Sequence, residues 1–314
     1  MKNTDIISSP PSTSTGRTRK NPFRKTWRLH VLLLPAVLLA IIFKYAPMPG
    51  IVMAFQDFKP WLGISQSPWV GWDNFQLMFT LRGTVQVIWN TLLISVMKII
   101  FGLAVPVLFA LMLNEVRNMG MKRSIQTMVY LPHFMSWVIL GGILLDLLSL
   151  DGIVNRLLLF MNLDPVMFLG EGDWFRATVI ISDLWKEFGF SAIVFLAALS
   201  GINPDLYEAA EIDGAGRMQQ TIHITLPSLM PMMVVVFTLS LGNMLNANFD
   251  QIFNLINPLV LEKGDIIDTF VFRSFQDGQY SLATTVGLFK SVIGFILISG
   301  GYYVAYRWAN YRIF

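Results

Sequence analysis

The sequence predicts an all-α membrane protein whose chain crosses the bilayer through six transmembrane helices. Of its 314 residues, 54% are hydrophobic and only 14% are charged, whereas a soluble domain carries about 25% charged residues. Several apolar runs reach the roughly 20 residues that a helix needs to cross a bilayer. The chain has no cysteine, which excludes a disulfide scaffold and thiolate metal sites. The composition therefore indicates a polytopic membrane protein and excludes an ordinary soluble enzyme.

Residues 1–28 are predicted to form a disordered basic tail, and residues 29–314 the transmembrane domain. The tail is rich in Ser, Thr and Pro and has no apolar period. Its basic cluster, followed by an apolar run at 30–43, also fits a cleavable signal peptide. No clear A-x-A site follows and apolar residues resume after Lys44, so we favour a retained first helix. The cluster comprises Arg17, Arg19, Lys20, Arg24, Lys25 and Arg28.

Six hydrophobic segments follow one another along the chain, each long enough to cross about 30 Å at 1.5 Å per residue. We expect helices at 30–52, 86–113, 124–148, 176–201, 228–247 and 283–306. Prolines lie inside these segments or near their ends, at Pro35, Pro106, Pro132 and Pro231. They do not argue against spanning, because neighbouring helices can satisfy the freed carbonyls.

Lys and Arg in the short loops predict the orientation. With both termini cytoplasmic, the inner segments carry thirteen of these residues and the outer loops five. The outer loops are then 53–85, 149–175 and 248–282. The first of them is aromatic, which suits either a membrane-interface belt or a docking surface. Its aromatic residues are Phe55, Phe58, Trp61, Trp69, Trp72 and Phe75.

The predicted cytoplasmic loop at 203–227 carries the most specific pattern. Asn203-Pro204-Asp205 is a helix-start signal, and a short amphipathic helix follows from Leu206 to Ile212. Gly214 and Gly216 allow a sharp reversal before a second short helix leads to Leu226-Pro227. The result is a helix–turn–helix that presents small residues toward the cytoplasm, where another protein's backbone can approach closely.

This loop resembles the EAA loop of binding-protein-dependent ABC importer permeases. The match is Glu208-Ala209-Ala210, three residues, Gly214, nine residues, Ile224, one residue and Leu226-Pro227. Asn90-Thr91-Leu92 is similar to the family's NTL. The stretches 55–57 and 70–75 resemble its sugar-uptake branch. Residues 43–58 and 132–139 look closest to permeases for polygalacturonate- or alginate-type oligosaccharides.

The resemblance implies a type I permease fold in the cell (inner) membrane, working by alternating access. It implies a second homologous permease subunit, two copies of a cytoplasmic ATPase that binds ATP and Mg, and an extracytoplasmic solute-binding protein. This chain would hold no cofactor and no catalytic residue, and would contact a carbohydrate and membrane lipid. The loop would be the coupling helix, with the ATPase contact made by Glu208, Ala209, Ala210, Asp213, Gly214, Ala215 and Gly216.

Several polar residues lie at membrane depth, where they usually face a cavity or a bundle interior. Asp183, Lys186 and Glu187 share one face of the fourth helix beside Trp185. Lys98 is central in the second helix and Lys290 lies in the outer third of the sixth. Asn243, Asn246 and Asp250 are expected to form one stripe near the outer end of the fifth.

Two interpretations of these residues remain open. In the first they line the transport pathway, with amides and carboxylates binding sugar hydroxyls, Trp185 stacking on a sugar, and the lysines favouring a uronate. In the second, Lys186 or Lys98 pairs with Asp183 or Glu187 and only stabilises the bundle.

The sequence carries no nucleotide-binding or hydrolase motif. No G-x-x-x-x-G-K-[ST], H-E-x-x-H or G-x-S-x-G occurs, and His30, His133 and His223 are too scattered to predict a metal site. The net charge of +3 is too small to suggest nucleic acid. An ion-gradient-driven secondary transporter is the alternative, supported by Asp183 and Glu187, but it leaves the 203–227 loop unexplained. A membrane-embedded enzyme would need a convergent catalytic set, and none is visible.

Overall fold

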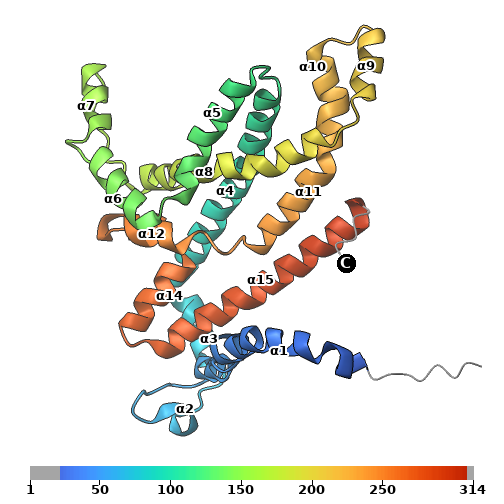
Figure 1. Cartoon of the computed structure of the whole chain (residues 1–314). Coiled ribbons are helices and arrows are strands. Elements are labelled where there is room, and N and C mark those ends of the chain that lie inside the picture. The colour runs from blue at the N-terminus through green and yellow to red at the C-terminus, as the bar shows by residue number, and fades with distance from the viewer. Residues whose placement is uncertain (1–21, 310–314) are drawn as a thin grey trace, which may run out of the picture. The chain divides into compact units, whose positions relative to one another are not determined.

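The computed structural model describes residues 22–309 of the chain, and this part is almost entirely helical (Figure 1). Its β structure is one isolated antiparallel bridge between Gln56 and Trp69 in the described residues. The chain divides into two compact units, Met1–Gly50 and Ile51–Phe314. The all-α prediction is therefore confirmed, while the predicted tail lies outside the described residues up to position 21.

The first unit holds the beginning of the first predicted span. Helix α1, Pro22–Ala40, begins inside the segment expected to be disordered and contains Pro35. A π turn, Ile41–Tyr45, and a 3₁₀ helix, Met48–Phe55, continue it into the second unit. The stretch Leu29–Phe55 is apolar enough to cross a membrane.

The second unit contains the remaining helices. They are α2 Gly63–Gln66, α3 Asp73–Thr80, α4 Arg82–Asn114, α5 Met119–Tyr130, α6 Trp137–Leu147, α7 Ile153–Phe160, α8 Gly172–Ser200, α9 Asp205–Ile212, α10 Arg217–Gln220, α11 Leu226–Gly242, α12 Phe249–Leu255, α13 Leu261–Gly264, α14 Ile267–Gln276 and α15 Tyr280–Ala309. The longest pack side by side, α4 along α8 and α11 along α15. Buried apolar side chains such as Ala110, Phe195 and Leu229 join α4, α8 and α11.

Among residues 22–309, four helical stretches are long and apolar enough to cross a membrane, or five with one bent pair. They are Leu29–Phe55, Arg82–Asn114, Arg217–Gly242, Tyr280–Tyr303 and the pair α5–α6. Helix α8 has 29 residues and is long enough as well. It is not apolar enough to be counted, because its middle carries three charged residues, Asp183, Lys186 and Glu187. The count of six crossings therefore stays a prediction.

The third predicted span is broken, whereas the sequence predicted one continuous helix over 124–148. A 3₁₀ turn, Leu131–Phe134, ends α5, and α6 leaves at an angle of 100°. Pro132 cannot continue the α-helical hydrogen-bond ladder, and the Ser136 hydroxyl accepts a hydrogen bond from the Ile139 N–H at 3.4 Å to begin α6. The prediction was wrong here because it treated Pro132 as tolerated inside a span.

The fifth predicted span also ends early, at Gly242 instead of residue 247. The chain then forms a loop, 243–248, before α12. Asn248 takes a left-handed conformation (φ 70°), and its side chain caps α12 by accepting from the Gln251 N–H at 3.4 Å. The predicted single stripe of Asn243, Asn246 and Asp250 is therefore wrong, because Asn243 and Asn246 lie in the loop and Asp250 lies on α12.

Asn90 fixes the short helix α13 against α4, and the Thr91 hydroxyl accepts a hydrogen bond from the Ile267 N–H, at the beginning of α14, at 2.9 Å. The Asn90 amide donates to the carbonyls of Glu262 (2.9 Å) and Asp265 (3.1 Å). Arg176 of α8 donates to the Lys263 carbonyl at 2.7 Å and also to the Asn90 side chain. These side chains satisfy the carbonyls that a helix end leaves without partners.

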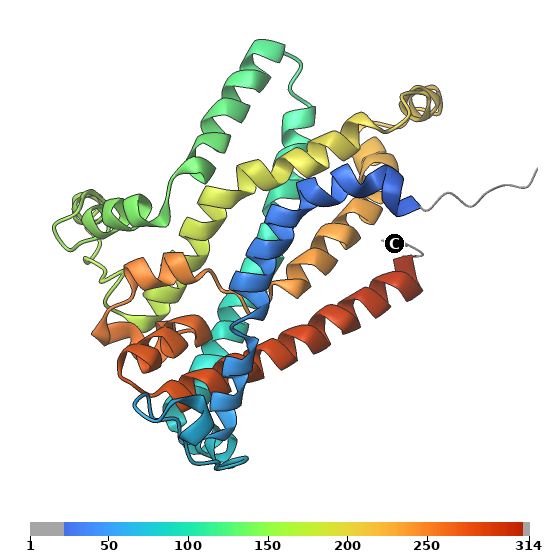
Figure 2. The ribbon, with the colours of Figure 1, turned by 60° about the horizontal axis from the view of Figure 1, so that its bottom comes forward.

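The two ends of the second unit match the loops predicted for opposite sides of the membrane (Figures 1 and 2). Helices α9 and α10 lie at one end of α11, and α12–α14 lie at the other. At the first end, Arg217 of α10 pairs with Glu115, which follows α4, so two predicted cytoplasmic loops meet. At the other end the Phe58 N–H donates to the Ser281 hydroxyl at 2.9 Å, and Asn257 donates to the Leu169 carbonyl at 2.6 Å, so the predicted outer loops meet there.

Replacing Gly189 by Ala is expected to destabilise the second unit. Gly189 of α8 packs against Val129 of α5, and a Cβ at Gly189 would overlap the Val129 side chain and backbone carbonyl. Because this contact is backbone, the helices must separate, at a cost of about 1–3 kcal/mol in unfolding free energy. Thermal unfolding of the purified protein in detergent measures it. Gly287→Ala in α15 is the control, since nothing lies within 4 Å of its Cβ position. Equal stability of both variants would contradict the prediction.

Candidate transport cavity and coupling loop

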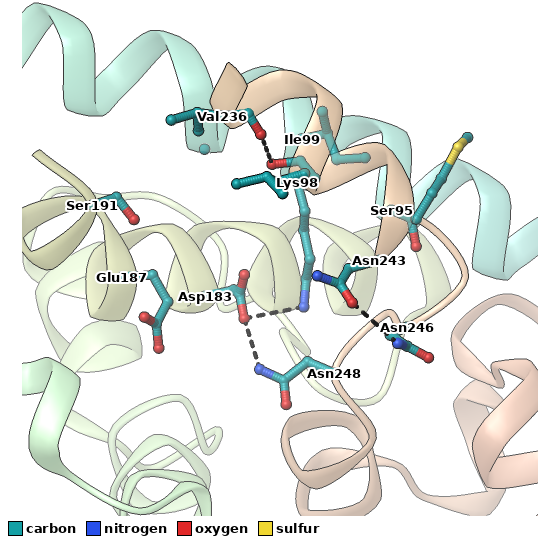
Figure 3. A pocket seen from close by; sticks show the side chains of 14 residues that line it. Ser95, Lys98, Ile99, Asp183, Glu187, Ser191, Val236, Asn243, Asn246 and Asn248 are labelled. Carbon is teal, nitrogen blue, oxygen red and sulfur yellow. Dashed lines mark hydrogen bonds and ion pairs between the residues drawn. The ribbon is translucent and has the colours of Figure 1, made fainter. Parts of the chain in front are cut away.

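A polar cavity of about 610 Å³ lies between α4, α8, α11 and the 243–248 loop (Figure 3). Of the residues predicted for the pathway, the lining contains Lys98, Asp183, Glu187, Asn243 and Asn246. Volumes of about 300–1,000 Å³ are typical of small-molecule sites. The cavity therefore has the size of a small-molecule site, and nine of its fourteen lining residues are polar.

Lys98 is held by a carboxylate and by the loop at the cavity wall. Its ammonium lies 3.2 Å from Asp183, donates to the Ala247 carbonyl at 3.1 Å and to the Gln251 side chain. Asp183 also accepts a hydrogen bond from the Asn248 amide at 3.0 Å. The side chains of Lys98 and Asp183 are only 11% and 18% exposed. This pair therefore ties α4 and α8 to the loop that closes one side of the cavity.

Lys290 of α15 holds the same loop from another direction. Its ammonium donates to the Asn246 side chain and to Asp268 of α14, both at 2.6 Å. Asn246 in turn donates to Asn243 at 3.5 Å (Figure 3). The loop is thus fastened between two lysines from different helices.

Lys186 and Glu187 hold the break between α5 and α6. The Lys186 ammonium donates to the His133 carbonyl at 2.9 Å and to Glu187 at 2.8 Å. The other Glu187 oxygen is 2.7 Å from His133 Nδ1, and the His133 ring stacks on Phe190. Lys98 pairs with Asp183 and Lys186 pairs with Glu187, so the ion pairs that the second interpretation requires are present. Because Asp183 and Glu187 also line the cavity, the two interpretations are compatible.

The other predicted pathway residues lie elsewhere. Trp185 is exposed and does not line the cavity, and Lys186 is buried against Trp137. Asp250 is exposed on α12, and Lys290 reaches the cavity only through Asn246. Each of the three membrane-depth lysines has a carboxylate partner, so their charges give no independent argument for an acidic solute.

Sequence reasoning missed several polar residues of this site, Ser191 and Ser240 of the cavity lining among them. Gln251 is fully buried and donates to Ser182 (2.9 Å) and to the Val179 carbonyl (2.8 Å). Asn248 contacts Asp183, and Ser95 lines the cavity with a buried hydroxyl that has no partner among the described residues. The repeated asparagines of residues 243–250 (NMLNANFD) indicate a polar loop. The sequence prediction missed this loop, because it assigned most of the stretch to a continuous helix.

The predicted coupling loop is a helix–turn–helix, as expected. Helix α9 carries Glu208, Ala209 and Ala210, and Asp213 follows its last residue. Gly214 turns the chain with a left-handed φ of 79°, which favours glycine. Ala215 follows, and the Gly216 N–H donates to the Gln219 side chain at 2.8 Å to begin α10. The Tyr207 hydroxyl lies 3.0 Å from that of Thr225 and joins the two arms.

No group of three or more His, Asp or Glu side chains able to hold a metal ion occurs within residues 22–309. The site therefore consists of a polar cavity inside a helical bundle and a glycine-turned protrusion at one end of it. These two features are typical of a membrane transport protein.

Residues 99–308 match the family of binding-protein-dependent transport system inner membrane components, and the chain belongs to this family. It is therefore a permease component of an ABC importer, which confirms the recognition made from the EAA-like loop. The family assignment also decides against the ion-gradient-driven transporter.

Two relatives from Bacillus subtilis (strain 168) extend the match to most of the chain. The chain is 41% identical to "Protein LplB" over 293 residues, covering 93% of this chain and 92% of the relative. It is 42% identical over 272 residues to the polygalacturonan/rhamnogalacturonan transport system permease protein YteP, covering 86% and 85%.

Solved structures agree with the sequence relatives. A bacterial ABC transporter involved in the import of the acidic polysaccharide alginate matches with a TM-score of 0.85 and 39% identity, over 91% of this chain and 98% of that chain. A second structure, an alginate ABC transporter in complex with an alginate pentasaccharide-bound periplasmic protein, matches at 0.84 and 38%, over 91% and 96%. The ABC permease fold is thereby confirmed.

Replacing Asp183 by Ala is expected to lower the unfolding free energy by about 3 kcal/mol, because it leaves Lys98 buried without its counter-charge. Unfolding in detergent measures the effect. The double variant Lys98→Met with Asp183→Leu should be more stable than Asp183→Ala alone, since it removes both charges. Asp57→Ala is the control, because Asp57 and Lys59 form an exposed pair at 3.4 Å that is worth at most about 1 kcal/mol. Similar losses for Asp57→Ala and Asp183→Ala would contradict the role of burial.

Proposed function

We propose that this chain is one of two homologous permease subunits that import an acidic, uronate-containing oligosaccharide across the cytoplasmic membrane. The observation that supports this most strongly is its likeness, over more than 85% of its length, to a polygalacturonan/rhamnogalacturonan permease and to an alginate importer. One sequence relative, named for polygalacturonan/rhamnogalacturonan, and two solved structures, titled for alginate, point to one chemical class of solute.

The 610 Å³ cavity is the proposed passage for the sugar. Asn243 and Asn246 offer amides that bind hydroxyls and ring oxygens, and Glu187 and Ser191 add acceptors and a hydroxyl from α8. Such groups suit the many hydroxyls of a sugar. Since the six predicted helices would enclose only part of a passage for an oligosaccharide, a second permease completes it.

The loop 203–227 is the proposed contact for a cytoplasmic ATPase, two copies of which bind ATP and Mg. In this arrangement both termini are cytoplasmic, and a solute-binding protein delivers the sugar to the end formed by α12–α14. The ATPase shifts the permease between two states only if it contacts them differently. Glu208, Ala209, Ala210 and the turn at Gly214 are the residues that make this contact.

Replacing Asn243 by Ala is expected to lower kcat/KM for oligogalacturonate uptake about fivefold to tenfold, because it removes one hydrogen-bonding amide from the cavity. Among the described residues the Asn243 side chain makes one hydrogen bond, a long one at 3.5 Å to Asn246, so the change should alter stability little. Uptake of labelled trigalacturonate into proteoliposomes with the complete importer measures it. Asn114→Ala, at the exposed end of α4, is the matched control. Wild-type uptake by Asn243→Ala would contradict the pathway assignment.

Replacing Gly214 by Val is expected to reduce the ATPase activity stimulated by the solute-binding protein more than tenfold. A β-branched residue at φ 79° strains the turn by about 1–2 kcal/mol and changes the protruding surface. Asn162→Val is the control, because Asn162 is exposed, also has a left-handed φ (57°) and lies outside both the 203–227 loop and α12–α14. Both variants should lose similar stability, and only Gly214→Val should lose coupling. Equal ATPase activity in the two variants would refute the assignment of this loop.

A further inference from the structure

A second pocket lies at the end of the unit opposite to the coupling loop. It has a volume of about 580 Å³ and is formed by the beginning of α4 together with α13 and α14. Its polar lining consists of Arg82, Gln86, Glu262, Asp265 and Arg273, and Phe270 supplies an aromatic wall. This lining is far more highly charged than a face turned toward lipid could be.

Two of the four charged residues in this pocket pair with each other, and the other two have no ion-pair partner among the described residues. Arg273 pairs with the buried Asp265, which also accepts from the Thr269 hydroxyl at 2.7 Å, so this pair is internally neutral. Arg82 is exposed and makes no hydrogen bond or ion pair with any described residue. Glu262 is exposed as well and has no ion pair within the described part of the chain. The pocket thus offers one available guanidinium beside one available carboxylate.

The pocket does not open onto the transport cavity. Residues 82–87 of α4 line the pocket, and residues 95–102 line the cavity. At 3.6 residues per turn, the two sets point in directions about 140° apart around the helix axis. A sugar bound here would lie on a different face of α4 from the passage. A protein partner therefore suits this pocket better than a sugar, because a protein surface can place an acidic group against Arg82 and a donor against Glu262.

We propose that this pocket receives an acidic side chain of the solute-binding protein, with Arg82 as its anchor. The inference rests on the proposed function, in which α12–α14 form the outer end where that protein arrives. A guanidinium without an internal partner binds a carboxylate through two parallel hydrogen bonds. Phe270 and the aliphatic part of Arg273 cover the bound side chain, and Glu262 faces a donor from the same partner.

The test is the affinity of the complete importer in nanodiscs for its solute-binding protein loaded with trigalacturonate. Arg82→Glu should weaken binding at least about tenfold, because it replaces attraction by repulsion at the anchor. The variant is expected to fold, since an acidic residue in the first turn of α4 suits the helix dipole. Arg82→Lys should retain intermediate affinity because it keeps the charge but not the fork geometry.

Arg156→Glu is the matched control. Arg156 is an exposed cation near the beginning of α7, at the same predicted outer side but outside the pocket. Equal binding by Arg82→Glu and wild type would overturn the assignment, as would equal losses in Arg82→Glu and Arg156→Glu. If the Arg82→Glu variant no longer co-purified with the second permease, the proposal would also be overturned, because the pocket would then be a contact between the two permease subunits. If the wild-type importer itself bound no solute-binding protein, the proposed function would fail instead.

Discussion

The neutralisation of charge at membrane depth is the constraint on which the second unit depends. Ionised side chains are costly in hydrocarbon unless they are paired and hydrogen-bonded. Lys98, Lys186 and Lys290 satisfy this condition through Asp183, Glu187 and Asp268, and each also donates to a backbone carbonyl or a side-chain amide. Lys98 joins α4 to α8 and to the 243–248 loop, Lys290 joins α15 to α14 and to the same loop, and Lys186 holds the break between α5 and α6. The same charges therefore specify both the packing and the position of the cavity.

The irregular backbone follows from the same principle. Non-helical backbone at membrane depth persists only where other groups satisfy its carbonyls and N–H groups. Lys186 accomplishes this at the α5–α6 break by donating to the His133 carbonyl, and Lys98 does it at the 243–248 loop by donating to the Ala247 carbonyl. A loop that is held by side chains instead of its own ladder can rearrange when those side chains exchange partners. This property suits a wall of a transport cavity.

The sequence predicted the helical class, most of the apolar spans and the helix–turn–helix form of the 203–227 loop, because each depends on local patterns. Apolar length marks a span, and the spacing of Glu208, Gly214 and Pro227 marks the loop. The break at Pro132 and the early end of α11 at Gly242 were missed, because tertiary partners decide whether a proline or glycine interrupts a helix. The pairing of Lys98 with Asp183 could only be left open, since sequence spacing within one helix does not fix contacts between helices. Gln251 and Asn248 were missed for the same reason.

A single helical stretch connects the 203–227 loop to the cavity. From Arg217 to Gly242 the chain is helical throughout, with a π turn at Thr221–Thr225, and this stretch of 26 residues is about 39 Å long. Its first residue pairs with Glu115 beside the proposed ATPase contact, and Asn243 at the cavity follows its last residue directly. A displacement of the Gly214 turn therefore reaches the cavity loop through one helical rod. Because Lys98 and Lys290 hold that loop on its other side, movement of the rod must either carry α4 and α15 along or break their hydrogen bonds to Ala247 and Asn246. Either outcome changes the shape of the cavity, which is what alternating access requires of the permease.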